Sequence, residues 1–247
     1  MSHHEILYAL TVLLLAYFVR GISGFGSGLI AVPLLALQFP LTQVVPFMLM
    51  ADFSASALIG GLHFRHVDKA EVVRLLPVSL VGIVLGTTLL VSLPTTALLA
   101  TLAGFILLFA LRFLLARPGP FTPISPRWAW PAALSGGAVG ALFGTGGPPY
   151  VIYLSHRIQD KTLLRATLSG LFFMEGLMRI VAFLVAGLLL DPDIWLYLLL
   201  AFPVILAALY GGSHIHTRLS NAQMQRLVGW LLLVSALSVA AKALQSG

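Results

Sequence analysis

The sequence predicts an all-α polytopic membrane protein built from two inverted repeats, each a broken-helix hairpin followed by three transmembrane helices. Three observations support this fold class. Of the 247 residues, 59% are hydrophobic and only 9% are charged, whereas soluble domains carry about 25% charged residues. Two long apolar stretches are interrupted by glycine and proline, and four basic loops are distributed along the chain. The solvent around most of this surface is therefore lipid.

The rest of the composition excludes several classes of function. The chain has no cysteine, so disulfides, iron–sulfur clusters and thiolate zinc sites are excluded. The formal net charge of +6 is better explained by cytoplasmic loops than by nucleic-acid binding, because no basic stripe with interleaved aromatic residues is present. The first apolar stretch lacks a convincing cleavage site, and we expect it to be retained. No cofactor is expected.

Six apolar runs have the length and the boundaries of ordinary membrane-spanning helices, which need about 20 residues to cross the hydrocarbon core. They are bounded by proline, by charges or by small polar clusters. The six predicted spans are Val44–Leu62, Val72–Leu93, Thr95–Leu115, Leu163–Leu190, Ile194–Tyr210 and Leu227–Leu244.

Two further apolar stretches, Ile6–Phe39 and Trp128–Leu154, are broken near their middle. The first contains the run Gly21-Ile-Ser-Gly-Phe-Gly-Ser-Gly28, and the second contains Gly144-Thr-Gly-Gly-Pro-Pro149. Glycine and proline at this density do not continue a helix. Each stretch is therefore predicted to form two half-helices joined by unwound backbone.

The two halves of the chain resemble each other at a shift of 120 residues, the separation of Gly24 from Gly144 and of Gly26 from Gly146. Three predicted spans follow each broken stretch. Two independent glycine-rich breaks are the weaker explanation, because both the spacing and the downstream order match. The predicted domains are a first repeat over residues 1–117 with its hairpin at 6–39, a linker over 118–127, and a second repeat over 128–247 with its hairpin at 128–155.

The distribution of basic residues favours a hairpin for each broken stretch. Positive residues collect in cytoplasmic loops, and the basic loops are residues 65–74, 112–127, 157–165 and 218–226. If each broken stretch crossed the membrane once, the last two loops would lie outside. If each stretch returns to its own side, all four loops lie in the cytoplasm. This arrangement inverts the two halves and places both termini outside.

The two breaks predict an anion site. A half-helix that starts after a glycine turn presents free backbone N–H groups and the positive end of its dipole. Two such tips that face each other near the bilayer midplane follow a recurring pattern of secondary transporters. Close packing through small residues is the alternative explanation of the glycines. The candidate substrate-binding residues are Arg20, Ser23, Gly24, Gly26, Ser27, Gly28, Gly144, Thr145, Gly146, Gly147 and Tyr150.

Four ionisable residues fall within apolar segments, where a charge is a functional candidate by default. Arg20 lies next to the first break, and its guanidinium fork suits sulfonate or carboxylate oxygens; a snorkelling role is the alternative. Asp52 is a candidate proton carrier or a partner of Arg20. Glu175 and Arg179 share one helix face and are candidates for either a structural ion pair or a proton relay.

No metal site is predicted. His63 and His66 flank one helix end, and His214 and His216 flank another, without intervening carboxylates. Such pairs make a poor metal site, and we expect these histidines to be solvated.

The two broken motifs resemble those of the TauE/SafE family of integral membrane proteins. The resemblance rests on residues 21–34 and 137–149 and extends over nearly the whole chain. It implies transport of a small anion, which in this family is associated with sulfite and organosulfonates such as sulfoacetate. Two departures bear on the substrate more than on the fold: Ser27 stands where glycine is frequent, and Tyr153 aligns with Pro33 of the first half.

Together these expectations describe a secondary transporter in the bacterial cytoplasmic membrane that moves a small oxyanion by alternating access. The alternatives are a passive anion channel and a non-transporting membrane assembly protein. An enzyme is not expected, because no nucleophile–base set or metal motif lies within the spans. The expected partners are a small anionic substrate and the lipid bilayer, with proton or cation coupling left open. The sequence does not determine the substrate, the coupling ion, the direction of transport or the oligomeric state.

Overall fold

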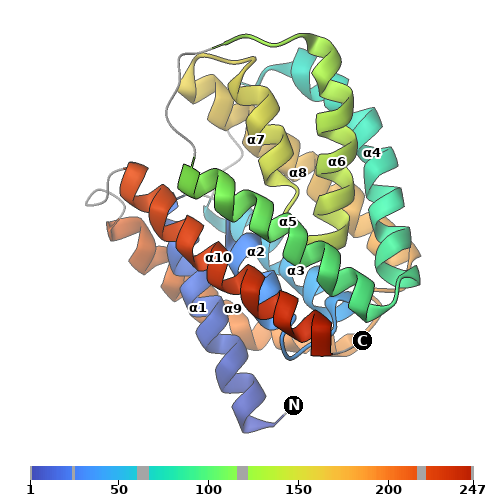
Figure 1. Ribbon diagram of the computed structural model, residues 1–247, viewed down its shortest axis with the longest axis vertical. Helices are drawn as coiled ribbons and strands as arrows, with labels where there is room; N and C mark the ends of the chain where they lie inside the picture. The colour runs from blue at the N-terminus through green and yellow to red at the C-terminus, as the bar shows by residue number, and fades with distance from the viewer. Residues whose placement is uncertain (1, 24–25, 60–66, 116–121, 216–220, 246–247) are drawn as a thin grey trace. The chain divides into compact units, whose positions relative to one another are not determined.

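The computed structural model describes residues 2–23, 26–59, 67–115, 122–215 and 221–245. Within these ranges the regular structure is helical throughout and contains no strand, so the predicted all-α fold is confirmed. The helices are α1 (His3–Ser23), α2 (Ser27–Leu35), α3 (Leu41–Ile59), α4 (Lys69–Ser92), α5 (Thr95–Leu115), α6 (Ala129–Phe143), α7 (Gly147–Ser155), α8 (Lys161–Val185), α9 (Pro192–Ile215) and α10 (Asn221–Gln245), and a short 3-10 helix, η2 (Pro126–Trp128), precedes α6 (Figure 1).

Five helices of the described chain are long and apolar enough to cross a membrane. Their qualifying segments are His3–Ile22, Lys69–Ser92, Thr95–Arg112, Thr162–Val185 and Pro192–His214. In α3 and α10 the described apolar stretches are shorter, Leu41–Ala55 and Gly229–Gln245. The chain is a multi-pass membrane protein.

Two predicted helix lengths are wrong. The first arm of the first broken stretch, predicted as a half-helix, is the 21-residue helix α1. At about 1.5 Å per residue, α1 is long enough to cross the hydrocarbon core on its own. The predicted span Leu163–Leu190 is too long, because α8 ends at Val185. Gly187 then adopts a left-handed φ of 77°, which is typical of the residues that follow a helix end.

The chain divides into two compact units, and each unit contains one broken pair of helices. The first unit comprises Met1–Ala51, Leu93–Arg117 and Pro192–Gly247 and holds the pair α1–α2. The second comprises Asp52–Ser92 and Pro118–Asp191 and holds the pair α6–α7. In the first unit α1 packs against α9, and in the second α6 packs against α4. Each broken pair thus packs against a helix from the other half of the sequence, while the inverted repeat itself stays a prediction.

Glycine lets helices approach closely in both units. In the second unit, where α4 and α6 run side by side (Figure 1), a β-carbon at Gly137 would collide with the carbonyl oxygen of Ser79. In the first unit, a β-carbon at Gly212 of α9 would collide with the carbonyl oxygen of Phe18 on α1. Lipid tails are as apolar as leucine, so close van der Waals packing supplies much of the association energy between membrane helices. These contacts hold one arm of each broken pair against a long neighbouring helix.

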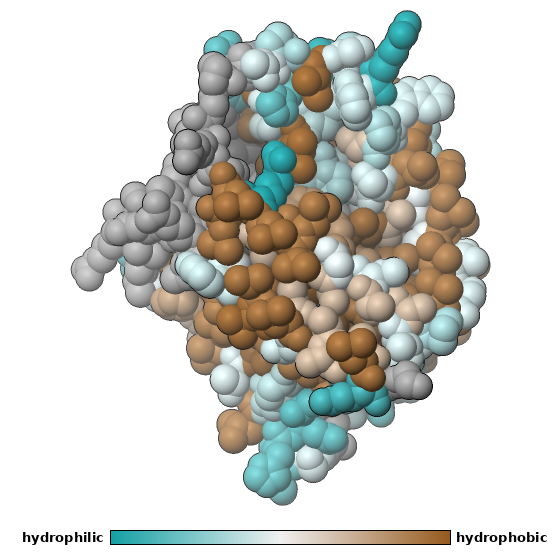
Figure 2. Space-filling model, viewed as in Figure 1, coloured by the Kyte–Doolittle hydropathy of each residue, from teal (hydrophilic) through white to brown (hydrophobic). Residues whose placement is uncertain are grey.

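The outer face of α5 and α10 in the first unit is apolar. Large side chains such as Leu108 and Leu237 remain exposed there, and Figure 2 shows hydrophobic residues over this helix pair. A groove of about 310 Å³ between the two helices is lined by alanine, glycine and leucine residues. Because this groove offers no polar group, it suits lipid rather than an anionic substrate.

Candidate functional site

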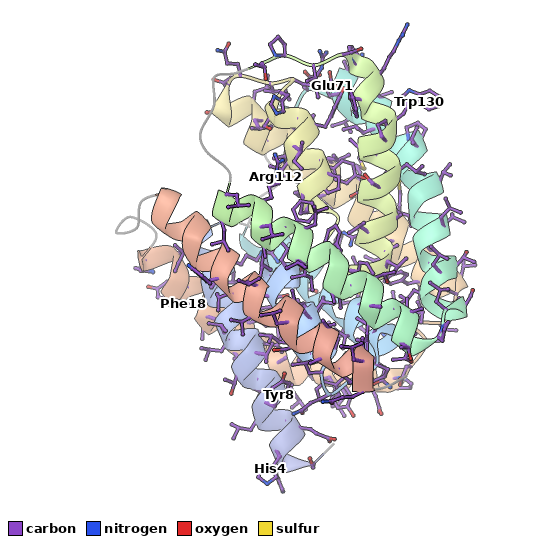
Figure 3. The ribbon with its side chains drawn as sticks, viewed as in Figure 1. His4, Tyr8, Phe18, Glu71, Arg112 and Trp130 are labelled. Carbon is purple, nitrogen blue, oxygen red and sulfur yellow. The ribbon has the colours of Figure 1, made fainter. Side chains whose placement is uncertain are left out.

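In both broken stretches the chain returns to the end at which it entered. In the first, the hydroxyl of Tyr8, near the start of α1, donates a hydrogen bond of 2.6 Å to the carbonyl oxygen of Leu34 at the end of α2 (Figure 3). In the second, the guanidinium of Arg157, just after α7, donates a hydrogen bond of 3.0 Å to the carbonyl oxygen of Ile124, before α6. The two breaks therefore lie at the tips of two hairpins. We call residues 23 and 26–28 the first tip and residues 144–147 the second tip.

The first tip brings together two of the predicted residues. Helix α2 begins at Ser27, directly after Gly26, whose φ of 95° favours glycine. Arg20 lies in the last turn of α1 and donates from Nη1 to the hydroxyl oxygen of Ser27 over 3.3 Å. Its guanidinium carbon also lies 5.7 Å from the ring centroid of Tyr17. Since a helix leaves its first N–H groups without an internal partner, the tip presents amide, hydroxyl and guanidinium donors together.

The other residues predicted for this region are described only in part. Ser23 ends α1, but its side chain and the whole of Gly24 lie outside the described residues. Gly28 is buried in the first turn of α2. Asp52 lies on α3, in the segment assigned to the second unit, so its pairing with Arg20 and its role in coupling stay predictions.

The second tip contains a buried hydroxyl group without a partner. Gly144 ends α6 with a left-handed φ of 65°, and its N–H donates to the carbonyl oxygen of Gly140 over 3.0 Å. Gly146 precedes α7, and a β-carbon there would collide with the carbonyl oxygen of Gly136. Thr145, between these glycines, is 6% exposed, and its hydroxyl has no hydrogen-bond partner among the described residues. A buried polar group without a partner is costly, and the Thr145 hydroxyl is therefore a candidate partner for a polar ligand at this tip.

The second tip offers fewer backbone donors than its sequence predicts. The first four residues of α7 are Gly147, Pro148, Pro149 and Tyr150, and proline has no N–H group. Half of the amides that a helix N-terminus leaves unpaired are therefore missing here. An anion at this tip depends more on side chains than an anion at the first tip.

Arg179 supplies such a side chain. It donates from Nη1 to the carbonyl oxygen of Gly140 over 3.0 Å, and its guanidinium therefore lies beside the end of α6. The Nε atom of Arg179 is buried and has no partner in the described part of the chain. Glu175, its expected partner one turn earlier, accepts hydrogen bonds from other groups. The second tip thus has the same two groups as the first, an arginine and a hydroxyl.

Tyr150 directs its hydroxyl away from the second tip, into a buried cluster. The hydroxyl lies 3.2 Å from the carbonyl oxygen of Ala133, near the far end of α6, and 2.8 Å from the hydroxyl of Ser79. Tyr150 and Ser79 both contact Oε1 of Glu175. We call Ser79, Tyr150 and Glu175 the carboxylate cluster; it joins α4, α7 and α8. No sequence pattern indicates a role for Ser79, because a single serine in an apolar helix is common.

A second buried carboxylate lies where the sequence predicted only a basic loop. Glu71, in the first turn of α4 (Figure 3), accepts hydrogen bonds from Tyr153 at 2.7 Å, from Nε of Arg157 at 2.9 Å and from Nη1 of Arg74 at 2.7 Å. These contacts tie α7, and Arg157 two residues beyond its end, to α4. The i,i+3 spacing of Glu71 and Arg74 was the one signal that could have found this group. Because two guanidinium groups neutralise Glu71, we assign the cluster a structural role.

Within the described ranges, no three histidine, aspartate or glutamate side chains lie close enough to hold a metal ion. His63, His66 and His216 lie outside those ranges. His214 contacts the carbonyl oxygen of Tyr210, on its own helix, at 2.8 Å.

Comparison with known proteins identifies a family and a relative of this chain. The sequence profile of the family "Sulfite exporter TauE/SafE" matches residues 9–239, a range that includes both tips. A relative from Comamonas testosteroni, described as "Probable inner membrane transporter protein TsaS", is 28% identical over 196 residues, which cover 78% of this chain and 80% of the relative. No solved structure matches the chain.

Proposed function

Because this chain belongs to the sulfite exporter TauE/SafE family, we propose that it is a secondary transporter that moves a small oxyanion, sulfite or an organosulfonate, by alternating access. The name of the relative from Comamonas testosteroni describes an inner membrane transporter, and we place this chain in the bacterial cytoplasmic membrane as well. The family is one of transporters, and we propose no enzymatic activity.

The observation that carries this proposal is the pairing of an arginine with a hydroxyl at each break. Arg20 donates to Ser27 at the first tip. Arg179 lies beside the second tip, where Thr145 is buried without a partner. Arginine is rare at membrane depth and marks substrate pathways when it occurs there. An arginine and a hydroxyl at each hairpin tip support an anion site at each tip.

The chemistry of these groups suits a sulfur oxyanion. Sulfite and sulfonates carry three oxygen atoms on one sulfur, so they accept hydrogen bonds from several directions. A guanidinium group donates two parallel bonds to such oxygens, and hydroxyl and amide groups can complete the set. Moving an anion out of water is costly unless it is both paired and hydrogen-bonded. Each tip offers both kinds of compensation.

Burial favours a carrier over a passive channel. An open channel exposes its polar lining to a continuous aqueous path. The Thr145 hydroxyl and the Arg179 Nε atom are both buried from solvent. An anion would reach them only after surrounding helices move, which is what alternating access requires.

The test is exchange of radiolabelled sulfite across proteoliposomes that contain the purified chain. Unlabelled sulfite inside should accelerate entry of the label, because a carrier returns with bound substrate and a channel does not. Hydrogen bonds to charged groups contribute about 1.5–3 kcal/mol, and each 1.4 kcal/mol corresponds to about tenfold in affinity. Arg20→Gln and Arg179→Gln should therefore each lower exchange at sub-saturating sulfite at least about tenfold.

Arg112→Gln is the matched control, since Arg112 is exposed in the last turn of α5; its exchange should stay at the wild-type rate. Thermal unfolding in detergent shows whether each variant folds. Folded tip variants with wild-type exchange would contradict the assignment of the site. Entry of label that internal sulfite does not accelerate would indicate a channel.

A further inference from the structure

We propose that Glu175 carries a proton together with the transported anion, so that the chain is a proton–anion symporter. This inference rests on the proposed transport function and assigns its coupling ion. Four observations support it: the burial of Glu175, the neutral character of its partners, the proton count of the carboxylate cluster, and its place one helical turn from Arg179, which lies beside the second tip.

Glu175 is a deeply buried carboxyl group that lacks a cationic hydrogen-bond partner in the described structure. It is 1% exposed, and Ser79 and Tyr150 are fully buried around it. Its hydrogen-bond partners are these two hydroxyl groups. The other buried glutamate, Glu71, accepts from two guanidinium groups and one phenol. Glu71 is therefore neutralised by fixed charge, whereas Glu175 is neutralised most simply by a proton.

The groups around Glu175 come from five helices, its own included. Helix α4 provides the hydroxyl of Ser79, α7 that of Tyr150, and α6 the carbonyl oxygen of Ala133 that Tyr150 contacts. On α8 itself, Arg179 is one turn away. Helix α3 contributes the ring of Phe53, which packs against Gly176. Arg179 and Tyr150 are thus the charged and titratable groups around this carboxyl in the described chain.

Counting protons shows that the cluster can hold Glu175 in either charge state. Four oxygen–oxygen contacts join Ala133, Tyr150, Ser79 and Glu175, while the two hydroxyls supply only two protons. With Glu175 ionised, both hydroxyls donate to the carboxylate. With Glu175 protonated, it donates to Ser79, Ser79 donates to Tyr150, and Tyr150 donates to the carbonyl of Ala133. The change between the two states adds or removes one proton on Glu175, and the hydroxyl hydrogens of Ser79 and Tyr150 rotate to new acceptors.

The position of the cluster links this proton to the anion. Arg179 lies one helical turn from Glu175 and beside the second tip, and Tyr150 belongs to the first turn of α7, which starts at that tip. The positive charge of Arg179 favours an ionised carboxylate nearby. An anion bound at Arg179 cancels that charge, so anion binding and protonation of Glu175 favour each other. One anion and one proton then cross together.

The experiment uses purified protein in proteoliposomes that contain a trapped pH-sensitive dye, with the membrane potential clamped. Methanesulfonate and sulfoacetate are the probes, because both stay ionised over the pH range used and cannot carry a proton themselves. In the wild type, an inward substrate gradient should acidify the lumen, and an inward proton gradient should accelerate uptake at least fivefold. Exchange at equal substrate and equal pH on both sides measures transport without coupling.

Glu175→Gln keeps the neutral shape of the side chain but cannot release a proton. Its exchange should stay within about twofold of the wild type, while lumenal acidification and the effect of the proton gradient should be lost. Glu5→Gln, near the start of α1, is the control. It should retain both lumenal acidification and the effect of the proton gradient on uptake. If Glu175→Gln does not fold, Tyr150→Phe carries the test, because loss of this hydroxyl should shift the pH at which acidification is half-maximal.

The outcomes separate this inference from the proposed function. Absence of exchange of sulfite and of both probes in the wild type would contradict transport itself. Exchange without lumenal acidification in the wild type would overturn proton coupling and leave transport intact. Folded Glu175→Gln protein that still acidifies the lumen, or that has lost exchange as well, would overturn the role of Glu175. If lumenal acidification in Tyr150→Phe is half-maximal at the same pH as in the wild type, the role of Glu175 would be overturned as well.

Discussion

The backbone N–H of Ile124, shortly before α6, donates a hydrogen bond of 3.4 Å to the carbonyl oxygen of His156, directly after α7. The imidazole Nδ1 of His156 in turn lies 2.9 Å from the carbonyl oxygen of Thr122. The chain therefore enters and leaves the second broken stretch at one place. A segment that crossed the membrane once would separate these residues by the thickness of the bilayer.

This relationship predicts the sidedness of introduced thiols. The chain has no cysteine, so Ser125→Cys, Gln159→Cys and Leu190→Cys each carry a single thiol. A membrane-impermeant maleimide should label positions 125 and 159 from the cytoplasmic side and position 190 from the outside, because α8 separates the last two. Labelling is measured on intact cells and on inside-out vesicles. Reaction of positions 125 and 159 from opposite sides would contradict the hairpin.

The close approach of α4 and α6 predicts a large effect of one methyl group. Gly137→Ala should lower the free energy of unfolding by about 2 kcal/mol, the usual cost of overpacking, because its β-carbon would collide with the backbone of Ser79. Gly104→Ala on α5 is the control, since a β-carbon there meets no atom within 4 Å, and the change should be neutral or slightly stabilising. Thermal unfolding in detergent compares the two. Equal unfolding midpoints for Gly137→Ala and Gly104→Ala would show that α4 and α6 can move apart without loss of stability.

The hydrogen bonds of Glu71 predict that α7 is anchored by this cluster. Tyr153→Phe removes one donor and should lower the free energy of unfolding by about 1 kcal/mol. Glu71→Ala leaves Arg157 without its carboxylate and should cost about 3 kcal/mol or more; the contribution of Arg74 is smaller, because its side chain is 36% exposed. The two changes should be non-additive, since they share one interaction. Full additivity of the unfolding midpoints in the double variant would contradict a shared contact.

Because the Thr145 hydroxyl is buried without a partner in the described chain, we expect its removal to have opposite effects on stability and on sulfite binding. Thr145→Val removes a buried hydroxyl without a partner, so the unliganded protein should be as stable as the wild type or more stable by about 1 kcal/mol. Its affinity for sulfite should fall about tenfold, seen as a smaller rise of the unfolding temperature when sulfite is added. Thr87→Val is the matched control, because Thr87 on α4 is equally buried and also unpartnered in the described chain. If sulfite raises the unfolding temperature of Thr145→Val as much as that of the wild type, the Thr145 hydroxyl does not bind sulfite.

The breaks and most helices could be predicted from sequence because their causes are local. Gly26 and Gly144 adopt positive φ angles, and the density of glycine and proline in the two stretches predicts both breaks. The arms of the hairpins were harder to predict, since glycine density indicates where a helix ends but not how far back it extends. Helix α1 therefore turned out longer than a half-helix.

The contacts within the candidate site could be predicted only in part, because they join residues far apart in sequence. Arg20 and Ser27 are seven residues apart, and their proximity follows from the break between them. Ser79 and Glu175 are 96 residues apart, and nothing local in either helix indicates that they meet. Tyr153 departs from the first half, which has Pro33 at the matching position. Its hydroxyl donates a hydrogen bond to Glu71, 82 residues earlier in the chain, and nothing local to Tyr153 indicates this contact.

Lys242 donates from Nζ to the carbonyl oxygens of Ala36 and Leu37, at 2.9 and 2.8 Å, just beyond the end of α2. The first unit joins residues 1–51 to residues 192–247, whereas the second unit contains no residue after 191. On the ribosome, the second unit can therefore assemble while the first still lacks its partner helices. The hairpin that emerges earliest during biosynthesis is the one that must wait longest for its final contacts.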